Sequence, residues 1–207
     1  MVQSSRFDSA ALTWDEKPMR VKIAQDVAEG VLHNLPIDDE MTLLDYGCGT
    51  GLVALFLQPY VKQVIGIDSS QGMLAAMEQK VKKLGLSNVE IRYGDLAKEE
   101  GLEEESVDLI VTSMTMHHIQ DVGHLFKKFY SALRSGGYLA VADLDQEDGT
   151  FHTHGNEGVA HFGFDRALMR QWFEDAGLID VRDVTVHEVK KENGRTYPIF
   201  LMTGRKA

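Results

Sequence analysis

Short apolar runs alternate with longer amphipathic stretches along most of the chain, and the two patterns predict strands and helices in turn. The apolar runs of strand length are residues 41–46, 64–67, 89–93, 107–114 and 138–144. The stretches with helical spacing of apolar side chains are residues 18–34, 52–58, 70–84, 121–135 and 165–176. Strands that alternate with helices favour right-handed crossovers and a doubly wound parallel sheet.

The helix ends carry matching signals. Pro18 occupies a tolerated first position, and Ser70, Asp121 and Asp165 are suited to cap the N-termini of the helices that follow them. Glycines follow three of the helical stretches, at Gly85, Gly136-Gly137 and Gly177, where a chain commonly leaves a helix.

The last two apolar stretches, residues 179–192 and 195–205, flank Asn193-Gly194. This dipeptide is the strongest short hairpin signal, so we expect an antiparallel pair at one sheet edge. The predicted fold is therefore α/β: a three-layer, doubly wound, mostly parallel seven-stranded sheet with an antiparallel C-terminal edge hairpin.

The first predicted strand ends in Asp45-Tyr46-Gly47-Cys48-Gly49-Thr50-Gly51, and a short helix follows. Glycine tolerates positive φ, and its missing side chain lets a ligand touch the backbone. The N–H groups at a helix start add to such a site. Three glycines at alternate positions are more than a plain turn needs, so this stretch predicts a ligand-binding loop.

The spacing of the glycines helps to identify the ligand. In the dinucleotide fingerprint Gly-x-Gly-x-x-Gly, the third glycine would fall at Leu52, whereas here it falls at Gly51. Asp45 is awkward beside a pyrophosphate but suited to a cation or an amine. Asp68, at the end of the second strand, can accept both hydroxyls of a ribose. These features fit S-adenosylmethionine (SAM) better than NAD.

Five segments in order and spacing resemble the class I SAM-dependent methyltransferases of the small-molecule, methyltransferase domain 11-like type. They are Asp45-x-Gly47-x-Gly49-x-Gly51, residues 68–74, Gly94-Asp95-Leu96, residues 107–119 and residues 133–141. The resemblance implies SAM as cofactor and S-adenosylhomocysteine (SAH) as product. It also implies one methyltransferase domain over 1–207, divided into an N-terminal lid and helix (1–36), a cofactor-binding core (41–145), a substrate-side loop (146–164) and a C-terminal helix and hairpin (165–207).

The resemblance also implies which residues bind the cofactor. They are Asp45, Gly47, Cys48, Gly49, Gly51, Asp68, Ser69, Met73, Gly94, Asp95, Leu96, Ser113 and Met114. Met73 would lie against the adenine ring, although it also fits an ordinary core position.

Candidate acceptor-side residues follow the fourth strand, at the carboxyl edge where such sheets bind ligands. His117 and His118 titrate near neutrality and are the candidate catalytic residues, either as a general base or in contact with the substrate; support of the loop is the alternative. Neighbours on extended chain face opposite ways, so we expect only one of them to meet the substrate.

Other candidates for substrate binding are Trp14, Asp143, His152 and His154. Trp14 is either a pocket wall or a hydrophobic staple for the next helix. Asp143 and Asp145 either hold a cationic acceptor, serve as a base, or make capping and loop hydrogen bonds. His152, His154 and His161 have spacing that also suits metal ligands. Histidines in a loop are more often lid or solvent-facing groups, so we expect no metal.

Composition narrows the class. The chain has 207 residues, 43% hydrophobic, which suits one domain, and a net charge of −11, which disfavours a nucleic-acid partner. Cys48, the single cysteine, excludes an internal disulfide and a cysteine-based zinc site. No run is long and apolar enough to span a membrane and no leader is evident, so we expect a cytoplasmic protein, a monomer or homodimer, with no membrane partner.

The expected reaction is in-line methyl transfer to a small molecule, which mainly requires alignment of the reactants. Three alternatives stay open from the sequence: a non-catalytic regulatory module that binds SAM or SAH, an aminopropyltransferase on the same fold, and an NAD-dependent oxidoreductase. The acceptor atom is not specified by any motif.

Overall fold

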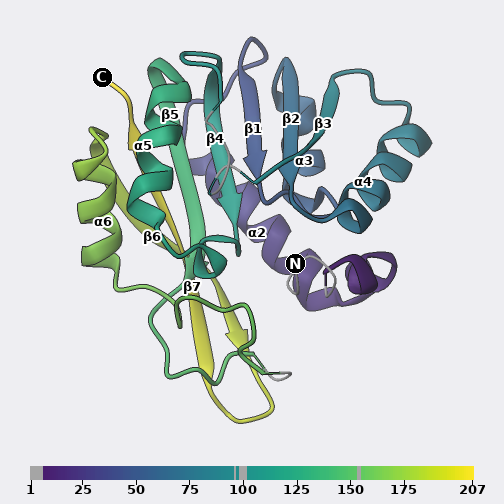
Figure 1. Cartoon of the computed structure of the whole chain (residues 1–207), viewed down its shortest axis with the longest axis vertical. Coiled ribbons are helices and arrows are strands. Elements are labelled where there is room, and N and C mark those ends of the chain that lie inside the picture. The colour runs from purple at the N-terminus through teal and green to yellow at the C-terminus, as the bar shows by residue number, and fades with distance from the viewer. Residues whose placement is uncertain (1–6, 96, 98–101, 153–154) are drawn as a thin grey trace.

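The computed structural model describes residues 7–95, 97, 102–152 and 155–207, and its strands form one seven-stranded sheet in the order β3-β2-β1-β4-β5-β7-β6 (Figure 1). The strands are β1 (Thr42–Tyr46), β2 (Gln63–Asp68), β3 (Val89–Tyr93), β4 (Val107–Ser113), β5 (Leu133–Leu144), β6 (Ile179–Lys190) and β7 (Thr196–Arg205). The first five pair in parallel, and β7 runs antiparallel between β5 and β6. The predicted fold, including the reversed edge hairpin, is confirmed.

Helices cover both faces of this sheet, which makes three layers. The α-helices are α2 (Pro18–Asn34), α3 (Leu52–Leu57), α4 (Gln71–Leu84), α5 (Val122–Ala132) and α6 (Arg166–Asp175), and the 3₁₀ helices are η1 (Ala11–Glu16), η2 (Gln58–Tyr60) and η3 (Met116–His118). Apolar side chains of α2, α3 and α4 form one core with one face of the sheet, and those of α5 and α6 form a second core with the other face.

The predicted helix caps are in place. The Ser70 hydroxyl accepts a hydrogen bond from the Met73 backbone N–H, and the carboxylates of Asp121 and Asp165 accept from the first turns of α5 and α6. Gly85 adopts a left-handed conformation after α4. These caps fix where each helix starts, because they satisfy N–H groups that have no partner within the helix.

Two details of the sequence-based prediction are wrong. Helix α5 ends at Ala132 and not at Gly136-Gly137, because these glycines belong to β5. A Cβ on Gly137 would lie 2.8 Å from the Asp108 carbonyl oxygen, so the irregular start of the β4–β5 pairing requires glycine there. The helical spacing of residues 18–34 predicted an apolar stripe of Val21, Ala24, Val27, Ala28 and Val31, but Val21 is 37% exposed and Ile23 is buried instead.

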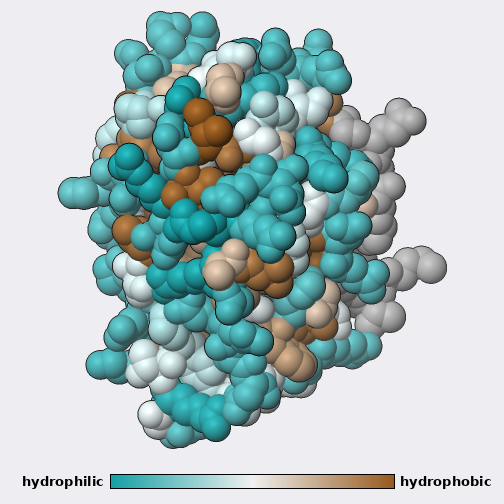
Figure 2. Space-filling model, turned by 90° about the vertical axis from the view of Figure 1, so that its left-hand side faces the viewer, coloured by the Kyte–Doolittle hydropathy of each residue, from teal (hydrophilic) through white to brown (hydrophobic). Residues whose placement is uncertain are grey.

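The carboxyl ends of β1, β2, β4 and β5 lie along the lower edge of the sheet as drawn, where the N-terminal segment and the loop after β5 also lie (Figure 1). This edge is where parallel α/β sheets bind ligands. On the side of the molecule where α6 and β6 lie, the surface is largely hydrophilic, with hydrophobic residues in separate groups (Figure 2). Within the described residues, no helix is both long and apolar enough to cross a bilayer.

Candidate active site

The glycine loop joins β1 to α3, and its three glycines all have positive φ, of +71° at Gly47, +54° at Gly49 and +81° at Gly51. Their surroundings differ. A Cβ on Gly47 would lie 2.4 Å from the Thr115 side chain, and one on Gly51 would lie 2.7 Å from Met77, whereas one on Gly49 would meet nothing within 4 Å. Gly47 and Gly51 therefore let the protein pack closely on the loop, and Gly49 presents bare backbone to open space.

Asp68 ends β2 next to this loop. Its carboxylate accepts hydrogen bonds from the backbone N–H groups of Gly49 and Ser70, both at 2.8 Å. Burial raises the pKa of Asp68, while these hydrogen bonds act in the opposite direction. Each carboxylate oxygen can accept a further hydrogen bond, so the side chain remains suited to ribose hydroxyls.

Asp45 lies one strand over and is only 2% exposed. Its Oδ2 atom is buried without a hydrogen-bond partner. Burial, with repulsion from Asp68 in addition, raises the pKa of Asp45 to about 7. A buried carboxylate oxygen without a partner is costly unless a donor or cation comes to it. The open backbone at Gly49, the Asp68 carboxylate and this oxygen together fit an adenosine compound that carries a positive charge, as SAM does.

The remaining cofactor candidates surround the same edge. Asp95 lies beyond β3, and the Tyr46 hydroxyl lies 3.4 Å from its Oδ1 atom. The Gly94 backbone N–H donates to the Asp68 carbonyl. Met73 is 2% exposed, so its side chain lies inside the protein at the start of α4.

Five further candidates complete this set. Ser113 ends β4, and the next residue, Met114, has a φ of +54°, a backbone conformation that costs free energy for a residue other than glycine. Cys48 is buried inside the glycine loop, and Ser69 is exposed just after β2. Leu96 lies outside the described residues.

The N-terminal segment (residues 7–16) lies across this edge of the sheet. Asp8 accepts hydrogen bonds from the Ser70 hydroxyl at 2.6 Å and the Gly72 backbone N–H at 2.8 Å, which lower its pKa. Asp15 accepts from the Thr50 hydroxyl at 2.6 Å and pairs with Lys80 at 2.7 Å. The segment is thus tied to both helices that start beside the cofactor candidates.

His117 and His118 lie in η3, with ring centroids 4.1 Å apart. The chain turns in a 3₁₀ helix here and is not extended, so the two rings lie side by side; that only one of them meets the substrate stays a prediction. His117 Nδ1 lies 2.7 Å from Asp143, and His118 Nδ1 lies 2.8 Å from the Gly158 carbonyl oxygen. Since a carboxylate and a carbonyl can only accept, both Nδ1 atoms carry the proton in the neutral rings, and both Nε2 atoms keep a lone pair.

The two histidines differ in their surroundings. His117 is buried, whereas His118 is half-buried and its ring meets Phe7 of the N-terminal segment edge-on at 5.5 Å. Burial and the neighbouring His117 lower the pKa of His118 to about 4. A histidine with so low a pKa is neutral at physiological pH and a weak base, which favours contact with the acceptor over proton abstraction.

Asp143 was a candidate for substrate binding, and its surroundings give it another role. It is 0% exposed, and its oxygens accept from the His117 ring, the His117 backbone N–H and the Leu144 backbone N–H. Burial alone would raise the pKa of Asp143, but attraction to His117 and these hydrogen bonds lower it. Asp143 therefore orients His117, and its complete burial leaves neither oxygen exposed to a substrate. Asp145 forms a two-point ion pair with Arg166 at 2.6 and 2.8 Å, so each of its oxygens already has a charged partner.

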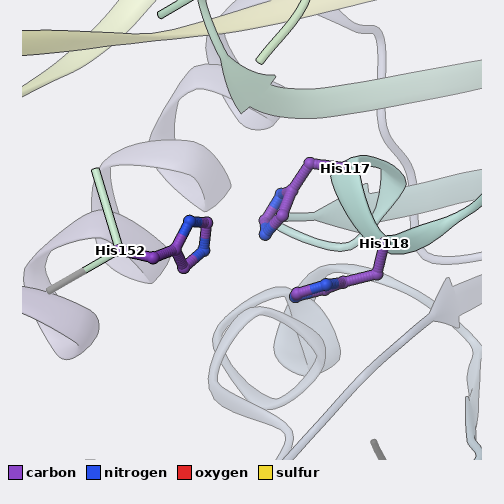
Figure 3. Close-up of side chains that lie close together, drawn as sticks. All are labelled: His117, His118 and His152. Atoms are coloured by element: carbon purple, nitrogen blue, oxygen red, sulfur yellow. The ribbon is translucent and has the colours of Figure 1, made fainter. Parts of the chain in front are cut away.

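His152 comes from the loop after β5, and its ring faces His117 from the other side of the site (Figure 3). The centroid of the His152 ring lies 5.3 Å from that of His117 and 6.2 Å from that of His118. His161 does not join them: its ring packs on Phe164 and its Nε2 atom bonds the Ile119 carbonyl. His154 lies outside the described residues.

Trp14, the other acceptor-side candidate, is separated from His118 by the ring of Phe7, which contacts both. Its ring contacts Phe7 at 5.8 Å and carries the Arg20 guanidinium at 3.5 Å. The sequence did not single out Phe7, Asp8 or Asp15 as site residues. Their only sequence signal was an aromatic residue and two acids in a segment without clear periodicity.

The comparisons agree with this geometry. Residues 44–141 match the family described as "Methyltransferase domain". The chain is 32% identical to the protein named "Uncharacterized methyltransferase C1347.09" of Schizosaccharomyces pombe, over 86% of this chain and 76% of that one. Several further curated relatives are matched over a smaller share of their own length, from 29% to 51%.

Solved structures share the fold. The methyltransferase in a complex with the Trm112 activator of Haloferax volcanii has a TM-score of 0.77 and 18% identity, over 96% of each chain. Phosphoethanolamine N-methyltransferase 2 of Haemonchus contortus, in complex with SAM, has a TM-score of 0.71 and 18% identity, over 88% of this chain and 52% of that one.

Proposed function

This chain belongs to the class I SAM-dependent methyltransferases, and from that premise we propose that it methylates a small-molecule acceptor held against His117 and His118. It is an enzyme whose cofactor is SAM. The acceptor class, the position of the acceptor and the roles of individual residues are the proposed part.

The observation that carries the proposal is the link between the glycine loop and η3. Thr115 packs on Gly47, and its hydroxyl lies 3.4 Å from the Gly47 carbonyl oxygen. The histidines follow it by two and three residues, so the acceptor side starts where the cofactor loop ends. This contact supports a short path from the cofactor to the Nε2 atoms of both histidines.

Bound SAM supplies an activated methyl group on a sulfonium ion. The protein then has to bind both partners, align them and keep water away, and alignment alone can lower a barrier by roughly 7–11 kcal/mol. We assign Asp45 to the positive end of the cofactor and Asp68 to its ribose. The N-terminal segment and the described part of the loop 146–164 close the site over the reactants.

Two features favour a small acceptor. The segments that cross the site are tied down: Ala160 and His161 donate to the His117 carbonyl, and Asp8 and Asp15 bond the starts of α4 and α3. Segments fixed over the strand ends leave less room for a polymer than for a small molecule. The net charge of −11 also disfavours a nucleic acid. The name of the Haemonchus relative specifies a small acceptor, phosphoethanolamine.

The proposal includes a cytoplasmic location, a monomer or homodimer, and no nucleic-acid or membrane partner. It is tested by incubating the protein with SAM labelled in its methyl group and three fractions of a cell extract: small metabolites, protein and RNA. We expect label in the metabolite fraction. Label in protein or RNA alone would contradict the small-molecule assignment, and no transfer to any fraction would favour a protein that only binds SAM.

A variant separates catalysis from cofactor binding. We expect His118→Ala to lower turnover at least tenfold while changing SAM affinity less than about threefold, because the ring faces the acceptor and not the glycine loop. Turnover and calorimetric SAM affinity are measured on the same preparation, with His124→Ala, an exposed histidine of α5, as the control. Equal losses of turnover and affinity would make His118 a structural residue.

A further inference from the structure

The three histidines of the site, His117, His118 and His152, form a group whose ring nitrogens converge. One ring nitrogen from each residue lies within 4.8 Å of the other two (Figure 3). The three residues come from η3 and from the loop after β5, which the sequence separates by more than thirty positions. Their meeting therefore results from the tertiary fold and not from a local motif.

The outer hydrogen bonds prepare two of these rings to act as ligands. His117 directs its Nδ1 to the buried carboxylate of Asp143, and His118 directs its Nδ1 to the Gly158 carbonyl. In metalloproteins, a histidine ligand almost always donates its second N–H to a carboxylate or a backbone carbonyl. Such a bond fixes the tautomer and leaves Nε2 to bind the metal.

The group also has the composition and spacing of a catalytic metal site. Three imidazoles with a fourth open position are one of the ligand sets that bind catalytic zinc. With Zn–N bonds of about 2.0–2.1 Å, tetrahedral ligand nitrogens lie roughly 3.4 Å apart. The nitrogens, up to 4.8 Å apart, lie somewhat wider than that spacing, and rotation of the side chains on binding would bring them to it.

We propose that His117, His118 and His152 bind one divalent transition-metal ion of the zinc class on the acceptor side of the cleft. The fourth position would take water or a donor atom of the acceptor. This differs from our expectation of no metal, which considered His152 only together with His154 and His161. The metal's part in catalysis rests on the proposed function, but its binding does not.

The test uses the full chain, stripped with a chelator and then titrated with Zn²⁺ by calorimetry in the absence of SAM. Co²⁺ serves as a second probe, because its visible absorption reports four-coordinate binding. We expect one ion per chain for the wild type and for the control His124→Ala. We expect His118→Ala and His152→Ala to bind Zn²⁺ at least about 100-fold more weakly, since even the loss of an outer partner costs roughly 10- to 100-fold.

SAH binding shows that each variant is folded, and His118→Gln or His152→Gln replaces an alanine variant that fails to bind SAH. Absence of Zn²⁺ and Co²⁺ binding by the wild type would overturn the inference, and so would unchanged affinity in both histidine variants. Methyl transfer by a protein that binds no metal would overturn it while leaving the proposed function intact. Metal binding without methyl transfer would support the metal site and contradict the proposed function.

Discussion

The three glycines of the cofactor loop have different roles in packing and in exposing the backbone, and the sequence alone does not distinguish them. Gly47 and Gly51 lie against Thr115 and Met77, and Gly49 faces open space. The sequence predicted a ligand-binding loop from their number, and it could not tell which glycine faces the ligand. That distinction depends on the side chains of Thr115, in the turn between β4 and η3, and of Met77 in α4.

Two alanine substitutions separate these tasks. Gly49→Ala is expected to weaken SAM binding at least tenfold with a loss of stability of about 1 kcal/mol, the cost of a left-handed alanine. Gly47→Ala is expected to lower stability by about 3 kcal/mol, because its Cβ would overlap Thr115 at 2.4 Å. Calorimetry and chemical denaturation measure the two effects. Equal losses of SAM affinity and of stability in the two variants would contradict the separate roles assigned to Gly49 and Gly47.

Asp45 links cofactor binding to pH. Its pKa in the folded protein is about 7, whereas an unfolded aspartate titrates near 3.9. The folded state therefore holds an extra proton between these values, and its stability falls as pH rises from about 4 to 7. A bound cation would stabilise the charged carboxylate of Asp45, which burial makes unfavourable in its absence.

We expect Asp45→Asn to change this dependence. Between pH 5 and pH 8 the wild type should lose a few kcal/mol more stability than the variant, because the amide never becomes charged. Denaturant titrations of both proteins across this range measure the difference. Parallel curves for wild type and variant would mean that Asp45 titrates normally.

Among the elements, η3 shows the limit of reasoning from the sequence. The end of β4 and the start of α5 were predicted from an apolar run and from the cap at Asp121. The residues between them were treated as extended, and the 3₁₀ turn instead brings His117 and His118 together. A three-residue turn has too few positions to show a period. The position of His152 beside these two histidines was not predictable either, because the loop that carries it has no regular spacing of apolar residues.

The N-terminal segment was recognisable only by resemblance, and its contacts give it a testable role. Asp8 and Asp15 tie it to α4 and to the glycine loop. The two aspartates are at least partly exposed, but their hydroxyl partners Ser70 and Thr50 are buried, and such a hydrogen bond typically contributes about 0.5–1.5 kcal/mol. We expect Asp8→Ala with Asp15→Ala to increase the dissociation rate of SAH about 2- to 10-fold without unfolding the protein.

Stopped-flow dissociation of SAH measures this rate, with Asp39→Ala, an exposed acid before β1, as the control. A dissociation rate in the double variant equal to that of the control would show that the segment does not retain the cofactor.

At the scale of the whole molecule, the alternation of strands and helices was enough to predict the sheet, because each helix must bury its apolar face on the strands beside it. The hairpin signal at Asn193-Gly194 predicted the reversed edge, which the observed order β5-β7-β6 confirms. This edge and the family match exclude the oxidoreductase alternative. The acceptor was not predictable, because its pocket is made by loops and not by the regular elements.

The central claim is that the strand ends of β1 and β2 bind SAM through Gly49, Asp45 and Asp68. Calorimetry with SAM tests it most directly, on the wild type, on Asp68→Ala and on Asp68→Asn, which keeps the size and removes the charge. We predict one site per chain, with affinity reduced about 10- to 150-fold in Asp68→Ala, the range for losing hydrogen bonds to a charged group. A wild type that fails to bind SAM, or an Asp68→Ala protein that binds it as tightly as the wild type, would contradict the account.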